Sequence, residues 1–198
     1  MREFKYVAKG NTPLVTHCNQ TADPLNRYAQ AMKPLTHKKN KTDQDHRDLA
    51  RVEWEAGLYL HDGIIVIPAD NIDKCLLEAA RRTKNGKKWK EGTMIAEDYL
   101  PLSYKGEKIK VKENGKIPNP ELDKYYSDHN YRALVKNGMS TIARTRPIFY
   151  DWSIGFTIMV DENVFDERTV DNIVETAGKY VGLCEKRPRL GNFSVEKK

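Results

Sequence analysis

Residues 153–197 read SIGFTIMVDENVFDERTVDNIVETAGKYVGLCEKRPRLGNFSVEK, and three patterns follow one another along them. From 153 to 160, apolar residues alternate with polar or small ones, as they do in a half-buried strand. After Asp166, which has the residue type of a helix N-cap, apolar residues recur at helical spacing. Residues 192–197 return to alternation. The stretch therefore predicts a strand, a helix and a final strand.

A similar order is expected nearer the N-terminus. Phe4, Tyr6 and Ala8 alternate with polar residues, which indicates a half-buried strand. Residues 64–67 form a continuous apolar run typical of a buried strand, and Asp70 then caps an expected helix that ends at the KNG sequence. Two such units, one near each end, predict an α+β fold of the ferredoxin-like type, an antiparallel sheet with helices on one face.

Two further helices are expected between these units. Asp23 followed by Pro24 is typical of a helix start, and Pro34 is expected to end or kink that helix. Thr42 followed by Asp45 matches a capping-box pattern, and an apolar stripe after it predicts a second helix.

From residue 84 to about 137 the periodicity weakens, and lysines, tyrosines and turn residues dominate. We expect a loosely structured basic insertion here, with a hairpin around the ENGK sequence at 113–116. Three lysines share one face of a presumed strand, where they either follow a phosphate chain or protect a sheet edge: Lys108, Lys110 and Lys112. Residues 1–198 are therefore expected to form a single α+β domain that carries this insertion.

The composition is that of a globular protein, with 39% hydrophobic and 31% charged residues in 198. The net charge of +6 favours a polyanionic partner such as nucleic acid, although it also suits simple solubility. The three cysteines lack CxxC spacing, which predicts neither a disulfide framework nor a zinc site and favours the reducing cytoplasm. The sequence has no apolar run of signal-peptide or membrane-spanning length, so we expect a protein without a membrane association.

A glycine-bounded basic loop lies within VGLCEKRPRLGNF, residues 181–193. Gly182 and Gly191 would allow the backbone to approach a phosphate closely, because glycine has no Cβ and tolerates positive φ. The loop's charges come from Lys186, Arg187 and Arg189. The same residues would also suit a helix cap followed by solvated charges.

The order of elements here, a helix before GLCEKRPRLGNF and a strand after it, resembles that around the glycine-rich loop of the RAMP superfamily, the RNA-binding proteins of CRISPR systems. The resemblance implies a ferredoxin-like, RRM-like fold and RNA as a partner. Cys184 and Asn192 stand where that superfamily often has further glycines. The chain is also similar over most of its length to an uncharacterised family of phage and prophage proteins, through GNTPLVTH, TADPLNRYAQAMK, GLYL, IPADNID, RTRPIFYDW and GLCEKRPRLGNF. This implies a location in the cytoplasm of a bacterial host.

A second basic cluster lies in RRTKNGKKWK, where six cations surround one indole. Cations for the backbone and a ring for base stacking are what single-strand binding uses. The alternative is a solvated helix end with the indole in the core. The cluster comprises Arg81, Arg82, Lys84, Lys87, Lys88, Trp89 and Lys90.

Arg144 and Arg146 are two residues apart, so strand alternation places both on the same side. Tyr150 and Trp152 continue this parity, and the strand could present charges and then rings on one sheet face. Trp152 also suits the core, and no RNP1-like octapeptide is present.

No P-loop, HExxH, GxSxG or Rossmann fingerprint occurs, and the five histidines form no metal pair at helical spacing. We therefore expect no metal, no cofactor and no catalytic residue. Some RAMP endonucleases cut RNA without metal through a histidine, which makes His17 and His129 the weak candidates for such a role.

These observations favour a non-catalytic phage protein that binds single-stranded RNA or DNA mainly through its phosphates and that could self-associate along the strand. Two alternatives stay open. One is an adaptor whose basic surface binds an acidic protein partner. The other is a metal-independent RNA endonuclease.

Overall fold

The computed structural model describes residues 1–112 and 114–198, which form a mixed α+β structure with antiparallel sheets. Their contacts divide into two compact units. The first comprises residues 1–14, 64–109 and 149–198, and the second residues 15–63 and 110–148. One domain with an insertion at about 84–137 was expected, whereas a boundary between the two units falls inside that segment, after residue 109.

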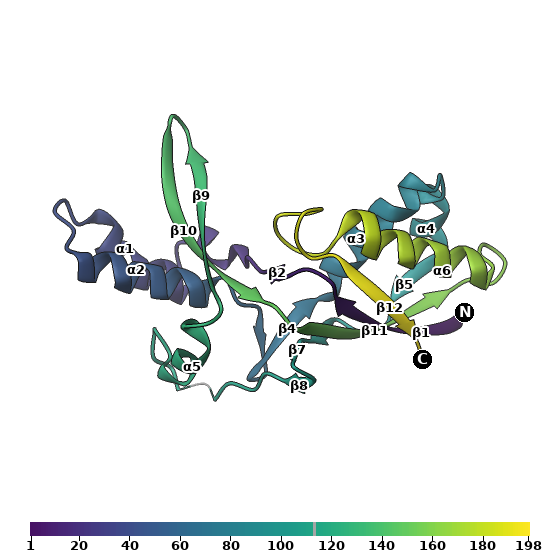
Figure 1. Ribbon diagram of the computed structural model, residues 1–198, viewed down its shortest axis with the longest axis horizontal. Coiled ribbons are helices and arrows are strands. Elements are labelled where there is room, and N and C mark those ends of the chain that lie inside the picture. The colour runs from purple at the N-terminus through teal and green to yellow at the C-terminus, as the bar shows by residue number, and fades with distance from the viewer. Residues whose placement is uncertain (113) are drawn as a thin grey trace. The chain divides into compact units, whose positions relative to one another are not determined.

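The main sheet of the first unit is built from the strands that the two ends of the chain predict (Figure 1). Its central strands are β1 (Arg2–Gly10) and β11 (Trp152–Val160), which pair antiparallel. On the outer sides, β12 (Phe193–Lys197) pairs with β1 and β5 (Thr93–Ile95) pairs with β11, again antiparallel. The order across these strands is therefore β12, β1, β11, β5.

Side-chain alternation gives this sheet its apolar face. Phe4, Tyr6 and Ala8 of β1 are buried, as are the alternate residues Ile154, Phe156, Ile158 and Val160 of β11. Helices α3 (Ala69–Arg82) and α6 (Glu167–Thr176) lie on one face of the sheet (Figure 1), and each buries an apolar stripe. The alternation and the helical stripes read from the sequence are thus confirmed.

Shorter elements complete the first unit. Strand β4 (Ile64–Pro68) leads directly into α3 and pairs with β6 (Tyr99–Pro101). Helix α4 (Gly86–Gly92) follows α3, and the hairpin of β7 (Ser103–Tyr104) and β8 (Glu107–Lys108) pairs with the start of β11. A π-helical turn, η3 (Ala177–Val181), extends α6.

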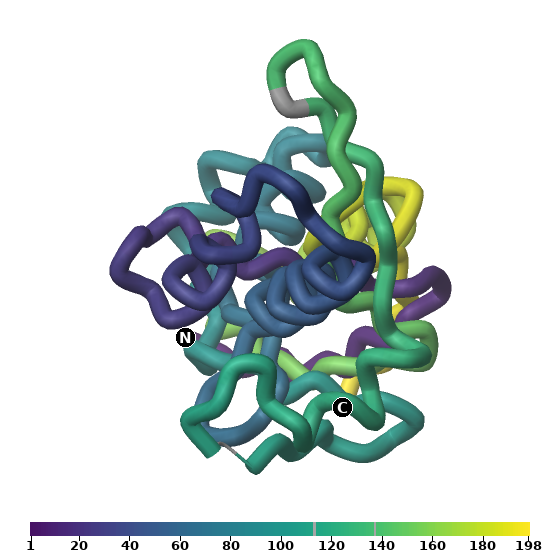
Figure 2. Tube along the Cα trace, turned by 90° about the vertical axis from the view of Figure 1, so that its left-hand side faces the viewer, coloured from purple at the N-terminus to yellow at the C-terminus, as the bar shows by residue number. Residues whose placement is uncertain are grey.

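The second unit contains a helical pair and a long hairpin. Helices α1 (Arg27–His37) and α2 (Asp43–Ala56) pack together, and Thr42 and Asp45 form the expected capping box at the start of α2. Strands β9 (Asn130–Asn137) and β10 (Ser140–Phe149) run together as a hairpin (Figure 2). The short elements are β2 (Leu14–Val15), which bridges the two units along the chain, η1 (Asn19–Ala22), β3 (Leu60–His61), η2 (Pro120–Leu122) and α5 (Asp123–Tyr126).

A buried polar cluster joins α2 to the segment after residue 110. Arg51 contacts Glu55 at 2.9 Å and Asp123 at 3.0 Å, and it donates to the carbonyl of Asn119 at 2.8 Å. Glu55 also accepts from the Asn119 N–H at 2.8 Å and from the Tyr28 hydroxyl at 3.2 Å. Burial and the Glu55 carboxylate raise the pKa of Tyr28 to about 12. These paired charges link α2 to residues 119–123 beside the apolar cluster of Tyr28, Val52 and Ala56.

The start of α1 differs from the prediction. Its N-cap is Asn26, whose side chain accepts from the N–H of Tyr28 at 2.9 Å, because residues before it form a 3-10 turn that Asp23 closes. Pro34 lies inside the helix and does not end it.

The predicted hairpin at ENGK is wrong over its described part. Glu113 lies outside the described residues, and residues 114–119 contain no strand. The hairpin instead turns at Gly138, which has a φ of +60°. The sequence signal for this hairpin is the Asn-Gly pair at 137–138. Because Asn137 pairs with Ser140, Gly138 and Met139 are the two loop residues, and a glycine at the first loop position suits a type II′ turn.

Candidate nucleic-acid interface

The cations of the RRTKNGKKWK cluster lie at the junction of α3 and α4, and all six are exposed. Four of them recur every third residue and surround a surface hollow of about 420 Å³: Arg81, Lys84, Lys87 and Lys90. The fifth lining residue is Gly86, and none of the described lining residues is acidic. A hollow whose described lining carries like charges and no carboxylate is an electrostatic arrangement that attracts phosphate.

A turn makes this arrangement possible. Lys84 has a φ of +61°, and the N–H of Asn85 donates to the Ala80 carbonyl at 2.7 Å. A Cβ at Gly86 would lie 2.5 Å from Cγ of Arg81, so the glycine leaves room for the arginine stem against the backbone. The sequence predicted this cluster by composition, but it did not show the hollow.

Trp89 does not take the role of an exposed base-stacking ring. Its side chain is 1% exposed and packs edge-on against Phe165, with ring centroids 5.7 Å apart. Burying so large an apolar ring in the core is more favourable than leaving it exposed to water among the lysines. Binding by this cluster therefore relies on charge.

Both glycines of the C-terminal loop form backbone hydrogen bonds within the protein. The Leu183 N–H donates to the Gly191 carbonyl at 2.8 Å, and the N–H groups of Gly182 and Gly191 donate to Ala177 and Pro13 carbonyls at 2.9 Å each. Both glycines have positive φ, +79° and +76°. The amides of both glycines are thus used within the protein in this conformation, and the approach of the loop backbone to a phosphate stays a prediction.

The loop still presents its charges. Lys186, Arg187 and Arg189 are exposed. Arg187 lies 3.6 Å from Glu78 of α3, and the same carboxylate lies 3.5 Å from Arg82. The loop and the end of α3 are therefore neighbours within the first unit. We call the basic face the surface formed by Arg81, Arg82, Lys84, Lys87, Lys90 and Arg187.

The exposed face of the main sheet offers little for base stacking. Its lysines pair with neighbouring acids, Lys5 with Glu3 at 3.5 Å and Lys9 with Glu196 at 2.5 Å. Trp152 is 2% exposed, and its indole N–H donates to the Thr12 carbonyl at 2.8 Å. The predicted continuous strand from Arg144 to Trp152 is also wrong, because β10 ends at Phe149 and Tyr150 lies in a turn.

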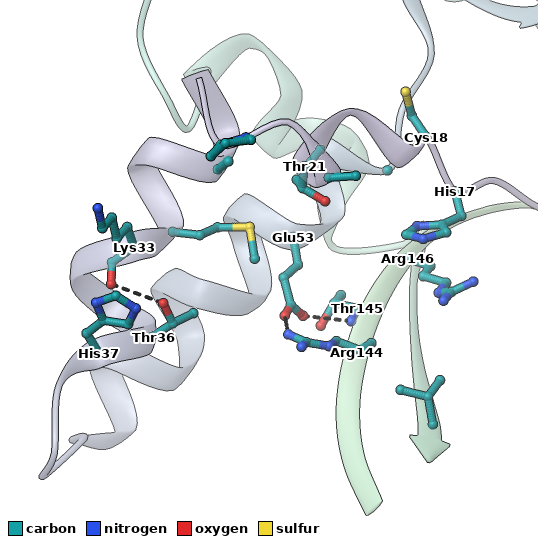
Figure 3. Close-up of a pocket in the computed structure, with 17 residues that line it drawn as sticks. His17, Cys18, Thr21, Lys33, Thr36, His37, Glu53, Arg144, Thr145 and Arg146 are labelled. Atoms are coloured by element: carbon teal, nitrogen blue, oxygen red, sulfur yellow. Dashed lines mark hydrogen bonds and ion pairs between the residues drawn. The ribbon is translucent and has the colours of Figure 1, made fainter. Parts of the chain in front are cut away.

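Arg144 and Arg146 line a cavity of about 560 Å³ in the second unit (Figure 3), and so does Thr145 between them. Lys33 and His37 of α1 line it too, and so does His17. Lys33 and His37 entered the site through the fold, because α1 carries no motif that distinguishes them from solvated residues, whereas His17 was already a candidate from the sequence.

Among the lining residues that the structure describes, Glu53 of α2 is the one carboxylate, and it is already engaged. It pairs with the guanidinium of Arg144 and accepts from the Thr145 N–H at 3.1 Å (Figure 3). The opposite part of the lining is apolar and includes Ala29, Met32 and Ala56. The cavity thus has Arg144 and Arg146 on the side of β10, and on the side of α1 it has apolar residues together with Lys33.

The two histidine candidates differ in position. His129 is 3% exposed, and its Nδ1 lies 2.8 Å from the Tyr125 carbonyl, so it is a core residue without access to a substrate. His17 lines the cavity (Figure 3). Of the two candidates, His17 is therefore the one that lines a cavity, whereas His129 is buried.

Among the described residues, no group of histidine, cysteine and carboxylate side chains could hold a metal ion. In the same part of the chain, no helix combines the length and apolar character that a bilayer crossing requires. Comparison with protein-family models finds no family that matches the chain, and comparison with curated proteins finds no match.

Proposed function

We propose that this protein binds single-stranded nucleic acid through the phosphates, with the basic face as its binding surface. The observation that carries the proposal is the hollow at the α3 and α4 junction, whose lining has four cations and no acid among its described residues. Arg82 and Arg187 extend this charge across to the C-terminal loop. Neutralising phosphates releases condensed counterions, and this supplies the affinity.

The strand order supports a ferredoxin-like core for the first unit. The succession β1, α3, β5, β11, α6, β12 with the sheet order β12, β1, β11, β5 is the arrangement expected of a β-α-β-β-α-β fold. The RAMP-like and phage-family assignments, and with them an RNA partner, are part of the same proposal. The RAMP-like assignment rests on the position of the loop between α6 and β12, and the phage-family assignment rests on the six sequence stretches named above.

A single strand suits this face better than a duplex for a physical reason. The cations are spread over a helix junction and a loop, and no described helix or strand of the face carries a row of side chains that could enter a groove and read base edges. We therefore expect weak sequence preference, side-by-side assembly along a strand and no catalysis.

Fluorescence anisotropy of labelled single-stranded RNA and DNA, with duplex controls, tests the proposal. With six cations in contact with phosphates, the logarithm of the association constant should fall with the logarithm of salt at a slope of roughly −4. The double variant Arg82→Ala, Arg187→Ala and the double variant Lys84→Ala, Lys87→Ala should each lower affinity and flatten this slope.

The matched control is Lys5→Ala, Lys9→Ala, which removes the same charge from the same unit at residues already paired with acids. Equal losses in the control and the two test variants would reject the basic face as the site. Absence of binding to every nucleic acid would reject the function itself and favour an adaptor for an acidic protein. Cleavage of the RNA in EDTA would favour the endonuclease.

A further inference from the structure

The cavity of the second unit has the properties of a small-molecule site. Its volume of about 560 Å³ lies within the range of known ligand pockets. All of its lining residues belong to the second unit, so the cavity is complete without the first. It is therefore a feature separate from the basic face.

The charges of the lining favour an anionic ligand. Arg144, Arg146 and Lys33 contribute three permanent positive charges, and Glu53 is the one acidic residue among the described lining residues. Because Glu53 pairs with Arg144 and accepts the Thr145 N–H, it also fixes the guanidinium in one orientation. A guanidinium held in this way offers its remaining N–H groups as a fork to a phosphate.

The opposite part of the lining favours a flat, largely apolar group. Ala29, Met32 and Ala56 come from the packed helices α1 and α2, and Met32 has a flexible thioether that adapts to a ring. Threonines at three places supply hydroxyls for polar ring edges: Thr21, Thr36 and Thr145. His17 and Arg146 lie together at the end of the cavity away from α1 (Figure 3), where the guanidinium can contact a phosphate.

We propose that this cavity binds a single nucleoside monophosphate, with its phosphate toward Arg144 and its base against Met32. The ligand is either a free nucleotide or the phosphorylated end of a strand, which share this chemistry. The inference does not rest on strand binding by the basic face, because the two sites lie in different units.

Methyl NMR on the full chain, labelled at the methionine methyl groups, tests the proposal directly. The chain has five methionines, at positions 1, 32, 94, 139 and 159, and Met32 is the one that lines the cavity. Titration with AMP, CMP, GMP and UMP should shift the Met32 signal, assigned through Met32→Leu, and leave the others in place. We expect half-saturation between about 10 μM and 1 mM.

Single variants distinguish nucleotide binding in this cavity from a general effect of the protein's net charge. Arg146→Gln and Lys33→Gln should each weaken nucleotide binding about tenfold or more, and Ala29→Leu should weaken it by filling the cavity without any change of charge. Lys39→Gln is the matched control, because Lys39 is exposed on the same unit and outside the lining. Thermal unfolding of each variant reports whether it is folded.

The outcomes distinguish a free nucleotide from the phosphorylated end of a strand, and the cavity from the basic face. A Met32 shift with free nucleotide identifies the free ligand, and a shift only with a 5′-phosphorylated tetranucleotide identifies a strand end. Both support the proposal, and the shift should persist in Arg82→Ala, Arg187→Ala. No Met32 shift with any of these ligands, an equal shift with adenosine or inorganic phosphate alone, or unchanged binding in Arg146→Gln and Lys33→Gln would overturn it.

Discussion

Arg187 in the C-terminal loop lies 3.6 Å from Glu78 on α3, and Glu78 also lies 3.5 Å from Arg82. One carboxylate therefore stands between two cations that are 105 residues apart in the chain, the difference between positions 187 and 82. This contact places the loop beside α3, and it also offsets part of the charge on the basic face.

Glu78→Gln is expected to tighten single-strand binding about two- to fivefold at low salt. The substitution removes one negative charge and frees two guanidiniums for phosphates, while the exposed ion pairs that it breaks contribute little to stability. Anisotropy titrations at two salt concentrations measure the effect, which should shrink at the higher one. Glu162→Gln, at an exposed residue before α6, is the control for net charge. Equal tightening by both variants would contradict a local role for Glu78.

Gly191→Ala is expected to destabilise the protein by more than about 2 kcal/mol, because two costs add. The added Cβ would lie 2.1 Å from the Leu183 carbonyl oxygen, and the residue has a φ of +76°. Gly106→Ala isolates the second cost, since Gly106 has a φ of +84° and nothing within 4 Å of an added Cβ. Urea unfolding gives both values. Equal losses of stability in the two variants would show that the close approach of the Leu183 carbonyl adds no cost.

Glu55→Ala is expected to cost about 3 to 5 kcal/mol, because it leaves Arg51 buried with less compensation. The double variant Arg51→Met, Glu55→Leu should be less destabilised than the sum of its two single variants, since it removes both charges together. A double-mutant cycle by chemical denaturation measures this coupling. Additive losses would show that the two side chains do not interact.

Cys75 and Cys184 are expected to react slowly with iodoacetamide at pH 8. Burial raises the pKa of each thiol to about 12, from an ordinary value of 9.0. The folded protein then holds roughly a thousandfold less thiolate at these positions than the unfolded chain does. Mass spectrometry of alkylated peptides with and without urea measures the difference, and fast labelling of both in the folded protein would refute it.

The same thiols make stability depend on alkaline pH. Their folded pKa lies above the unfolded one, so the unfolded chain loses protons first as the pH rises. The contribution to stability is complete below about pH 8 and declines above about pH 9. Urea unfolding between pH 7 and 10 should show this decline, and Cys75→Ala should reduce its steepness relative to the parent chain.

Local patterns predicted much of the fold because their causes are local. The alternation in β1 and β11 reports which side of a strand is apolar, and the Thr42 and Asp45 pair reports a helix start through bonds within four residues. The same reasoning found the basic residues of the RRTKNGKKWK cluster and of the C-terminal loop. It missed the hairpin of β9 and β10, since the Asn-Gly signal lies between strands with weak alternation.

The arrangement of these parts depends on contacts between distant segments, and no periodicity encodes them. The burial of Trp89, the closing of the loop through Leu183 and Gly191, and the position of Glu78 beside Arg187 follow from how the elements pack. The cavity brings Lys33 of α1 together with Arg144 of β10, which are far apart in the chain. Residue types and periods thus define the elements and the charged segments of this protein. Packing decides which of those charged residues lie side by side, because the free energy of folding comes from apolar surface buried between segments that are distant in the sequence.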